Sequence, residues 1–174
     1  MKTASTPLFA AFLSAFVAAC ATTSSAPPSA AAQLEGRSGA QVRGNVEFRA
    51  EGGSVRVLAQ VSGLAPGEHG FHVHEVGDCS APDATSAKGH FNPAGKPHGH
   101  HGGGERHAGD MPNLVADGYG NASISALLGQ LSLTEGPSGI LGRSVVIHAD
   151  PDDYKSQPAG NSGKRIACGV IRAR

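Results

Sequence analysis

The sequence has no tryptophan and few other aromatic residues, and it contains no strong amphipathic helical pattern. Its 174 residues include 25 glycines and 11 prolines, which favour turns and short strands over long helices. We therefore expect helix to be a minor component. A chain of this length has room for one ordinary domain with appendages.

An excess of charge of either sign is also absent, because 14 basic residues balance 14 acidic ones. The charge balance predicts no general surface for nucleic acid or membrane. The apolar stretch at residues 8–19 follows the basic Lys2 and is too short to span a bilayer. We interpret residues 1–19 as an export signal.

The end of this stretch, Val17 to Cys20, resembles the bacterial lipobox, in which small residues precede a cysteine that is lipidated and becomes the mature N-terminus. Ordinary cleavage nearby and a buried apolar helix are the alternatives. Lipidation predicts a location in the periplasm or cell envelope, with membrane attachment through Cys20. Residues 20–40, rich in Ala, Ser, Thr and Pro, are predicted to be a flexible tether. The domain would then span residues 41–174.

The three cysteines are an odd number for an exported protein until Cys20 is assigned to the lipid. Cys79 and Cys168 are then a natural pair, which an oxidising compartment would join in a disulfide. The alternative is two free structural cysteines.

Apolar and polar residues alternate in several short runs separated by Gly, Pro, Asn and Asp. This period of two predicts an all-β domain, an antiparallel sandwich or barrel. The predicted strands lie at residues 42–49, 55–61, 70–76, 122–126, 130–133, 144–148 and 166–171. Two long segments, residues 77–110 and 149–164, do not fit strands, and long loops in compact domains are usually functional or disordered.

Histidines mark these loops and the strands beside them. In "GFHVHEVGDC", a strand would place Phe71 and Val73 on one face and His72 and His74 on the other. Two such imidazoles lie close enough to bind one copper or zinc ion. A lone pair of this kind is more often a surface pair.

Five of the nine histidines lie between residues 89 and 110, where too few apolar residues occur to make a core. Their spacing predicts a closed site of three nitrogens and one oxygen, suited to zinc and made by His90, His98, His107 and Asp110. His148 leaves the predicted strand at 144–148. It would complete a second cluster with His72, His74 and His90.

The motifs "GFHVHEVGDC", "GHFNP", "GERHAGD", "GRSVVIHADPDD" and "GNSGKRIACGVI" resemble, in order, the signatures of the Cu,Zn superoxide dismutases. The resemblance covers almost all of residues 41–173. It implies an eight-stranded antiparallel Greek-key barrel, with two long loops that bind metal and guide the substrate outside it. It also implies dismutation of superoxide to dioxygen and hydrogen peroxide.

By this resemblance, the copper ligands are His72, His74, His90 and His148, and the zinc ligands are His90, His98, His107 and Asp110. His90 is the shared imidazolate, which would leave copper, carry a proton and return. Copper would be reduced by one superoxide and reoxidised by the next.

The resemblance also assigns supporting residues. Arg165 matches the active-site arginine that attracts superoxide, and Asp152 matches the carboxylate that joins ligands of the two metals. Cys79 and Cys168 match the family disulfide, and His69 matches a structural histidine. The loop at 149–164 is shorter than in the cytosolic members, so its substrate-guiding residues do not carry over; Lys155 and Lys164 are candidates.

Some points stay open at this stage. A homodimer is possible, but the quaternary state does not carry over between exported bacterial members. His100 and His101 match no family position. Two interpretations remain for them: a solvated, histidine-rich loop tip and a site that captures metal. Two other functions remain: a periplasmic buffer or delivery domain for copper and zinc, and a zinc-stabilised domain with an empty copper site.

Overall fold

The computed structural model describes Met1 and residues 28–174. The predicted export signal and the predicted lipidation at Cys20 both fall outside these residues. The elements are β1 (Ser29–Gly36), β2 (Arg43–Glu51), β3 (Ser54–Ser62), β4 (Gly67–His69), β5 (Phe71–His74), the 3-10 turn η1 (Thr85–Ala87), β6 (Leu114–Ala116), β7 (Ala122–Leu128), β8 (Ser144–His148), β9 (Arg165–Val170) and β10 (Arg172–Ala173).

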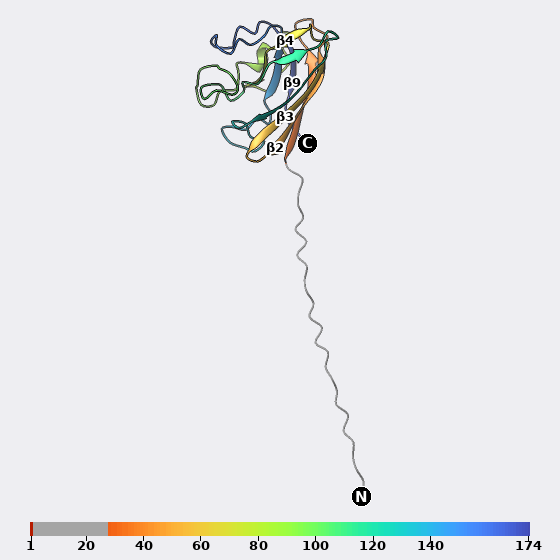
Figure 1. Cartoon of the computed structure of the whole chain (residues 1–174), viewed down its shortest axis with the longest axis vertical. Helices are drawn as coiled ribbons and strands as arrows, with labels where there is room; N and C mark the ends of the chain where they lie inside the picture. Colours follow the sequence, from red (N-terminus) through yellow and green to blue (C-terminus); the bar gives the residue numbers. More distant parts are fainter. Residues whose placement is uncertain (2–27) are drawn as a thin grey trace.

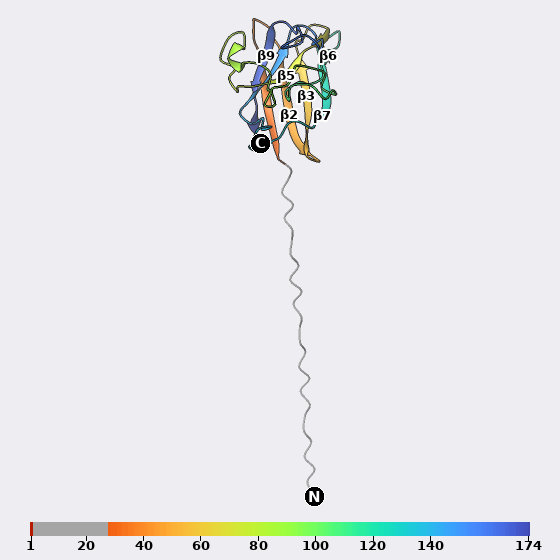
Figure 2. The same ribbon diagram turned by 90° about the vertical axis from the view of Figure 1, so that its left-hand side faces the viewer.

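The strands form one curled antiparallel sheet in the order β5-β8-β9-β1-β2-β3-β7, with β10 paired to β1 (Figure 2). A second pair, β4 with β6, joins the two ends, because β4 leads into β5 and β6 leads into β7. β8 returns after β7 to pair with β5, which gives the Greek-key order. The predicted all-β, antiparallel Greek-key class is confirmed.

Alternation along the strands separates the core from the surface. Val46 and Phe48 of β2 and Val57 of β3 are fully buried, while the residues between them are more exposed. The core also takes Phe71 and Val73 from β5. Such alternation is what a half-buried sheet requires.

The prediction of a flexible segment through residue 40 was wrong from Ser29 onward. β1 lies in the middle of the sheet, between β9 and β2, and Ala30, Ala32 and Leu34 are at most 1% exposed. The small alanine side chains fit the tightly packed interior, and backbone pairing on both sides stabilises the strand. In composition alone, the same residues are indistinguishable from a tether.

Two other strand predictions also need correction. Residues 130–133 form no strand, although Leu131 and Leu133 are buried, and only an isolated bridge joins Ser132 to Gly139. The short strand β6 was not predicted. Its pairing with β4 depends on residues far apart in the sequence.

The Cys79–Cys168 disulfide is present and confirms the predicted pairing. It connects the beginning of the long loop 77–110 to β9, with 5.7 Å between the two Cα atoms. Arg37 adds a hydrogen bond from Nε to the Cys79 carbonyl oxygen (2.9 Å). The first part of the loop is therefore fixed to the barrel.

The two long loops, residues 77–110 and 149–164, project from the same side of the barrel, where Figure 1 shows them in green and blue. Within the described part of the chain, no helix has the length and hydropathy needed to cross a membrane.

Candidate metal centre

His72 and His74 are placed by β5, as the sequence predicted. Phe71 and Val73 pack in the hydrophobic core, whereas the two imidazoles turn away from it. Both imidazoles are nevertheless completely buried, because the long loops cover that face of the strand. The loops thus make an enclosed polar compartment on the outside of the barrel.

Backbone hydrogen bonds align the loop histidines with β5. Phe91 N–H donates to the Val73 carbonyl oxygen (2.8 Å), and Val73 N–H donates to that of Gly109 (2.9 Å). As a result, His90 lies opposite His74, and Asp110 lies opposite His72. A β-carbon on Gly109 would overlap the Val73 oxygen, so this close approach requires glycine.

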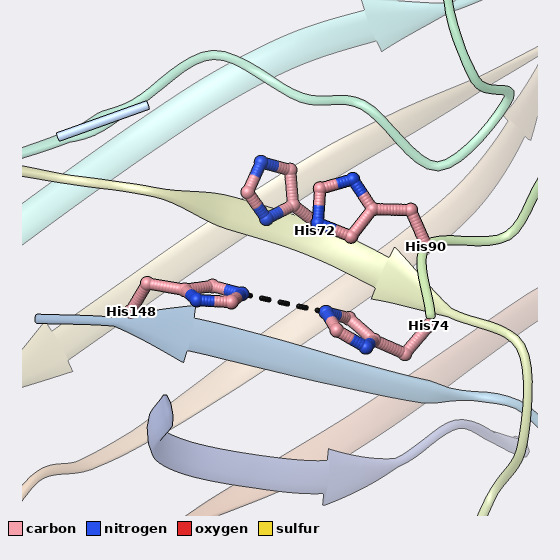
Figure 3. Close-up of side chains that lie close together, drawn as sticks. All are labelled: His72, His74, His90 and His148. Atoms are coloured by element: carbon pink, nitrogen blue, oxygen red, sulfur yellow. Dashed lines mark hydrogen bonds between the residues drawn. The ribbon is translucent and has the colours of Figure 1, made fainter. Parts of the chain in front are cut away.

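A first group of four imidazoles meets where β5 and β8 run side by side (Figure 3). Their ligating atoms all lie within 4.8 Å of one another. The Nε2 atoms of His74 and His148 are 3.4 Å apart. The group comprises His72, His74, His90 and His148.

The outer nitrogens of three of these rings are held by the protein. His74 Nδ1 donates to the Lys88 carbonyl oxygen (2.9 Å), and His148 Nδ1 donates more weakly to that of Gly163 (3.3 Å). His72 Nε2 donates to Asp152 Oδ2 (2.8 Å). These contacts fix the tautomers and leave the remaining nitrogens available to a metal ion.

Two buried ring nitrogens in this group, His72 Nδ1 and His90 Nε2, have no hydrogen-bond partner. An unpartnered buried polar atom is unfavourable unless a ligand binds it. The all-nitrogen group therefore fits an ion that prefers imidazole, such as copper.

A second group lies beside the first and contains one carboxylate. Asp110 Oδ1 is 2.9 Å from His90 Nδ1, 3.1 Å from His98 Nδ1 and 3.4 Å from His107 Nδ1. The other carboxylate oxygen, Oδ2, accepts the backbone N–H groups of His107 (2.9 Å) and Gly99 (3.2 Å). Three nitrogens and one oxygen around one point match the ligand set of a closed zinc site.

His90 belongs to both groups. Its Nδ1 faces Asp110 and His107, while its Nε2 faces the first group and has no partner. One imidazole can therefore contact two ions.

Asp152 connects the two groups by hydrogen bonds to one histidine of each, as the sequence predicted. Its Oδ2 accepts from His72 Nε2 and its Oδ1 from His98 Nε2, both at 2.8 Å. The backbone N–H of Tyr154 donates to the same Oδ1 (2.7 Å). A shift of this carboxylate would therefore displace a ligand of each group.

Two positioning residues were missed by the sequence analysis. Gln157 Oε1 accepts the backbone N–H of His98 (2.8 Å), and its Nε2 donates to the His98 carbonyl oxygen (2.9 Å). Asn113 makes the same double contact with the backbone of Asp152, at 3.1 Å each way. No local pattern distinguishes these two amides from surface residues.

The surroundings hold the first group neutral. Burial lowers the pKa of His72 and lowers those of His74 and His148 well below the ordinary value. Burial is also the main cause that lowers the pKa of His90 to about 3. Neutral imidazoles are the form that binds metal.

The second group behaves differently because it contains negative charge. Burial works against the charged form of His98, but Asp110 and Asp152 outweigh it and raise the pKa of His98 to about 9. Although burial opposes ionisation, hydrogen bonds from the histidines hold the pKa of both carboxyls well below the usual range. In the metal-free protein, these contacts hold a proton on His98.

Arg165 begins β9 and is half-buried beside the first group. Its Nη1 donates to the Ala84 carbonyl oxygen (2.8 Å), which orients the guanidinium. Its charge is a minor cause of the lowered pKa of His74 and His148, after burial and the neighbouring imidazoles. The positive charge of Arg165 therefore acts on the first group.

His69 also lies where the sequence analysis expected it. Its Nδ1 contacts the carbonyl oxygen of His148 (2.9 Å), and its Nε2 contacts that of Ala65 (2.8 Å). This ring supports the end of β8 and points to no ligand group.

Comparison with known proteins identifies the family. The profile of the copper/zinc superoxide dismutase (SODC) family matches residues 42–171. Cu-Zn superoxide dismutase 2 of Aquifex aeolicus (strain VF5) is 47% identical over 137 residues, which cover 76% of this chain and 80% of the relative. Cu-Zn superoxide dismutase 1 of the same organism is 46% identical over 134 residues, covering 74% and 79%.

A solved structure agrees with this match. The crystal structure of the clock protein EA4 superposes with a TM-score of 0.76 at 44% sequence identity, covering 85% of this chain and 96% of that one. The family match and the two ligand groups agree, and the chain belongs to the copper/zinc superoxide dismutase family.

Proposed function

We propose that this copper/zinc superoxide dismutase binds copper at the first group and zinc at the second, and that it converts superoxide to dioxygen and hydrogen peroxide there. The observation that carries this assignment is His90, whose two ring nitrogens face two separate ligand groups. Bound copper supplies one-electron exchange, whereas zinc has no redox chemistry.

The residues around the copper ligands handle the substrate and the proton. Arg165 attracts the superoxide anion by its charge, an effect that weakens as salt increases. His90 Nε2 is the unpartnered nitrogen on the side of the first group, and we assign it the proton that is passed to the reduced product. The buried neutral rings of His72, His74 and His148 hold the ligand geometry during turnover.

The first experiment measures dismutation by residues 28–174 when metal-free, with zinc, and with zinc plus copper, alongside elemental analysis. We expect activity only with copper, at about one copper and one zinc per chain, because residues 28–174 contain one group suited to each. Tight uptake of both metals without turnover would instead support the buffer or delivery function.

We also propose that the enzyme is exported and protects the periplasm or cell envelope, attached to a membrane by a lipid on Cys20. The Cys79–Cys168 disulfide supports export, because such bonds persist in oxidising compartments. It also leaves Cys20 as the remaining cysteine of three. The lipobox-like sequence before Cys20 is the second support.

Fractionation of cells that express the full chain tests this location. We expect the wild type in the membrane fraction, and Cys20→Ala either uncleaved or in a soluble fraction. Mass spectrometry of the mature N-terminus should find an acylated Cys20. Unmodified protein in the cytoplasm would contradict both export and lipidation.

A further inference from the structure

Besides His69, two histidines belong to neither ligand group, and they lie together at the tip of the zinc-binding loop. The His100 and His101 ring centroids are 4.1 Å apart, with 36° between the ring planes. The Tyr154 ring packs edge-on against His100 at 4.7 Å. A tyrosine from the other long loop therefore holds the pair in place.

Hydrogen bonds within the tip give it a defined shape. Gly103 N–H donates to the His100 carbonyl oxygen (2.7 Å), and Arg106 donates to that of Gly103. Lys96 Nζ donates to the carbonyl oxygen of Gly104 (3.0 Å). The two imidazoles are thus presented by an ordered turn, which lowers the entropy lost when both bind one ligand.

Each ring has a nitrogen that the protein holds weakly or not at all. His101 Nδ1 is enclosed by protein and has no hydrogen-bond partner, a state that costs free energy unless something binds it. His100 is exposed, and its Nδ1 accepts a single bond from Gly102 N–H (3.1 Å). Loss of such an exposed bond costs little, so the ring can turn toward an ion.

The position of the tip suggests its role. The second group is an inner group, because its four residues are only 0–8% exposed and have little contact with solvent. His101 lies three residues from His98 on the same loop. Tyr154, which packs on His100, also donates its backbone N–H to Asp152, the carboxylate that holds His98.

We propose that His100 and His101 form a third, surface site for a divalent ion of the zinc type, and that this site captures the zinc ion that then fills the inner group. The capture step rests on the proposed zinc-binding function of the inner group. Imidazole pairs bind zinc, copper and nickel ions. Zn²⁺ is the probe because zinc is the ion that the site is proposed to capture.

The site is tested on protein that already holds one copper and one zinc per chain, with Zn²⁺ added in a calorimeter. We expect one further ion in the wild type and its loss in His100→Asn and in His101→Asn alike. Glu105→Gln is the matched control, because it changes the charge of the same tip and keeps both imidazoles. Retention of the ion in His101→Asn would mean that exposed His100 binds alone, and would overturn the paired site.

The capture role is tested by the rate of zinc uptake into metal-free protein, followed by competition with a coloured chelator. In a variant that carries both His100→Asn and His101→Asn, zinc should fill the inner group several-fold more slowly than in the wild type, but it should reach the same final occupancy. An unchanged rate would overturn capture. Failure of the inner group to take zinc even in the wild type would overturn the zinc assignment itself, independently of the tip.

Discussion

His148 contributes to one ligand group, whereas Asp110 contributes to the other, so substitutions at these residues should separate the two metals. We expect His148→Ala to lose copper and dismutation while it keeps zinc and the fold. Asp110→Ala should lose zinc and loosen the long loop first. Elemental analysis with thermal unfolding measures both, and full copper-dependent activity in His148→Ala would show that the ligand assignment is wrong.

Gln157 lies at the surface, yet it makes two hydrogen bonds to the backbone of His98. Residues that orient metal ligands typically contribute roughly 10- to 100-fold to metal affinity, and we expect a loss of this size for zinc in Gln157→Ala. Gln157→Glu keeps an acceptor for the His98 N–H but loses the donor. Its zinc affinity should therefore lie between those of the wild type and Gln157→Ala. Copper affinity, measured in parallel, should not change; an equal loss of both metals would indicate general disruption of the loop.

The raised pKa of His98 predicts how zinc binding depends on pH. Because its pKa is about 9 in the metal-free protein, zinc must displace a proton from His98 at any lower pH. Zinc affinity should therefore fall as the pH falls below 9, by about tenfold per unit for one proton. Chelator competition at several pH values between about 7 and 9 measures the slope. A flat profile would contradict a protonated His98.

At the scale of loops and strands, the contact between the two long loops depends on Gly160. A β-carbon there would overlap Asp152 Oδ1 and lie 2.7 Å from His98 Nε2. We expect Gly160→Ala to displace the carboxylate that joins the two groups and to weaken binding of both metals. Gly160 also has a positive φ of 66°, a conformation that strains an alanine backbone. The effect of this strain must therefore be separated from the effect of overlap with Asp152.

Gly95 provides the matched control, because its φ is 63° and no atom lies within 4 Å of its β-carbon position. Gly95→Ala should therefore show the cost of strain alone, with metal affinity preserved. If the two variants lost metal affinity equally, overlap with Asp152 would not be the cause.

For the whole molecule, the Cys79–Cys168 disulfide closes a separation of 89 residues. A disulfide that closes a loop of this size lowers the entropy of the unfolded chain, which should stabilise the folded protein by about 4 to 5 kcal/mol. Cys79→Ser should lower the unfolding temperature under oxidising conditions and change little under reducing ones. Equal effects in both conditions would mean that the loss comes from packing at Cys79.

Much of the site could be predicted from the sequence, because its ligands are chemically distinctive and its strands alternate. The spacing of His90, His98, His107 and Asp110 predicted the second group. His72, His74 and His148, at two predicted strands, were predicted to complete the first group with His90. The strands predicted at 144–148 and 166–171 were close to those observed, β8 and β9, since apolar residues at every second position mark both in the sequence.

Only the tertiary structure decided the rest. Ser29–Gly36 is a central strand because β2 and β9 pair with it from both sides, and β9 comes from the far end of the chain. Gln157 and Asn113 are ordinary amides until folding brings them to the backbones of His98 and Asp152. Ligand identity is a property of single residues and can be read locally, whereas the positioning of ligands arises from long-range contacts that form only when the loops close over the barrel.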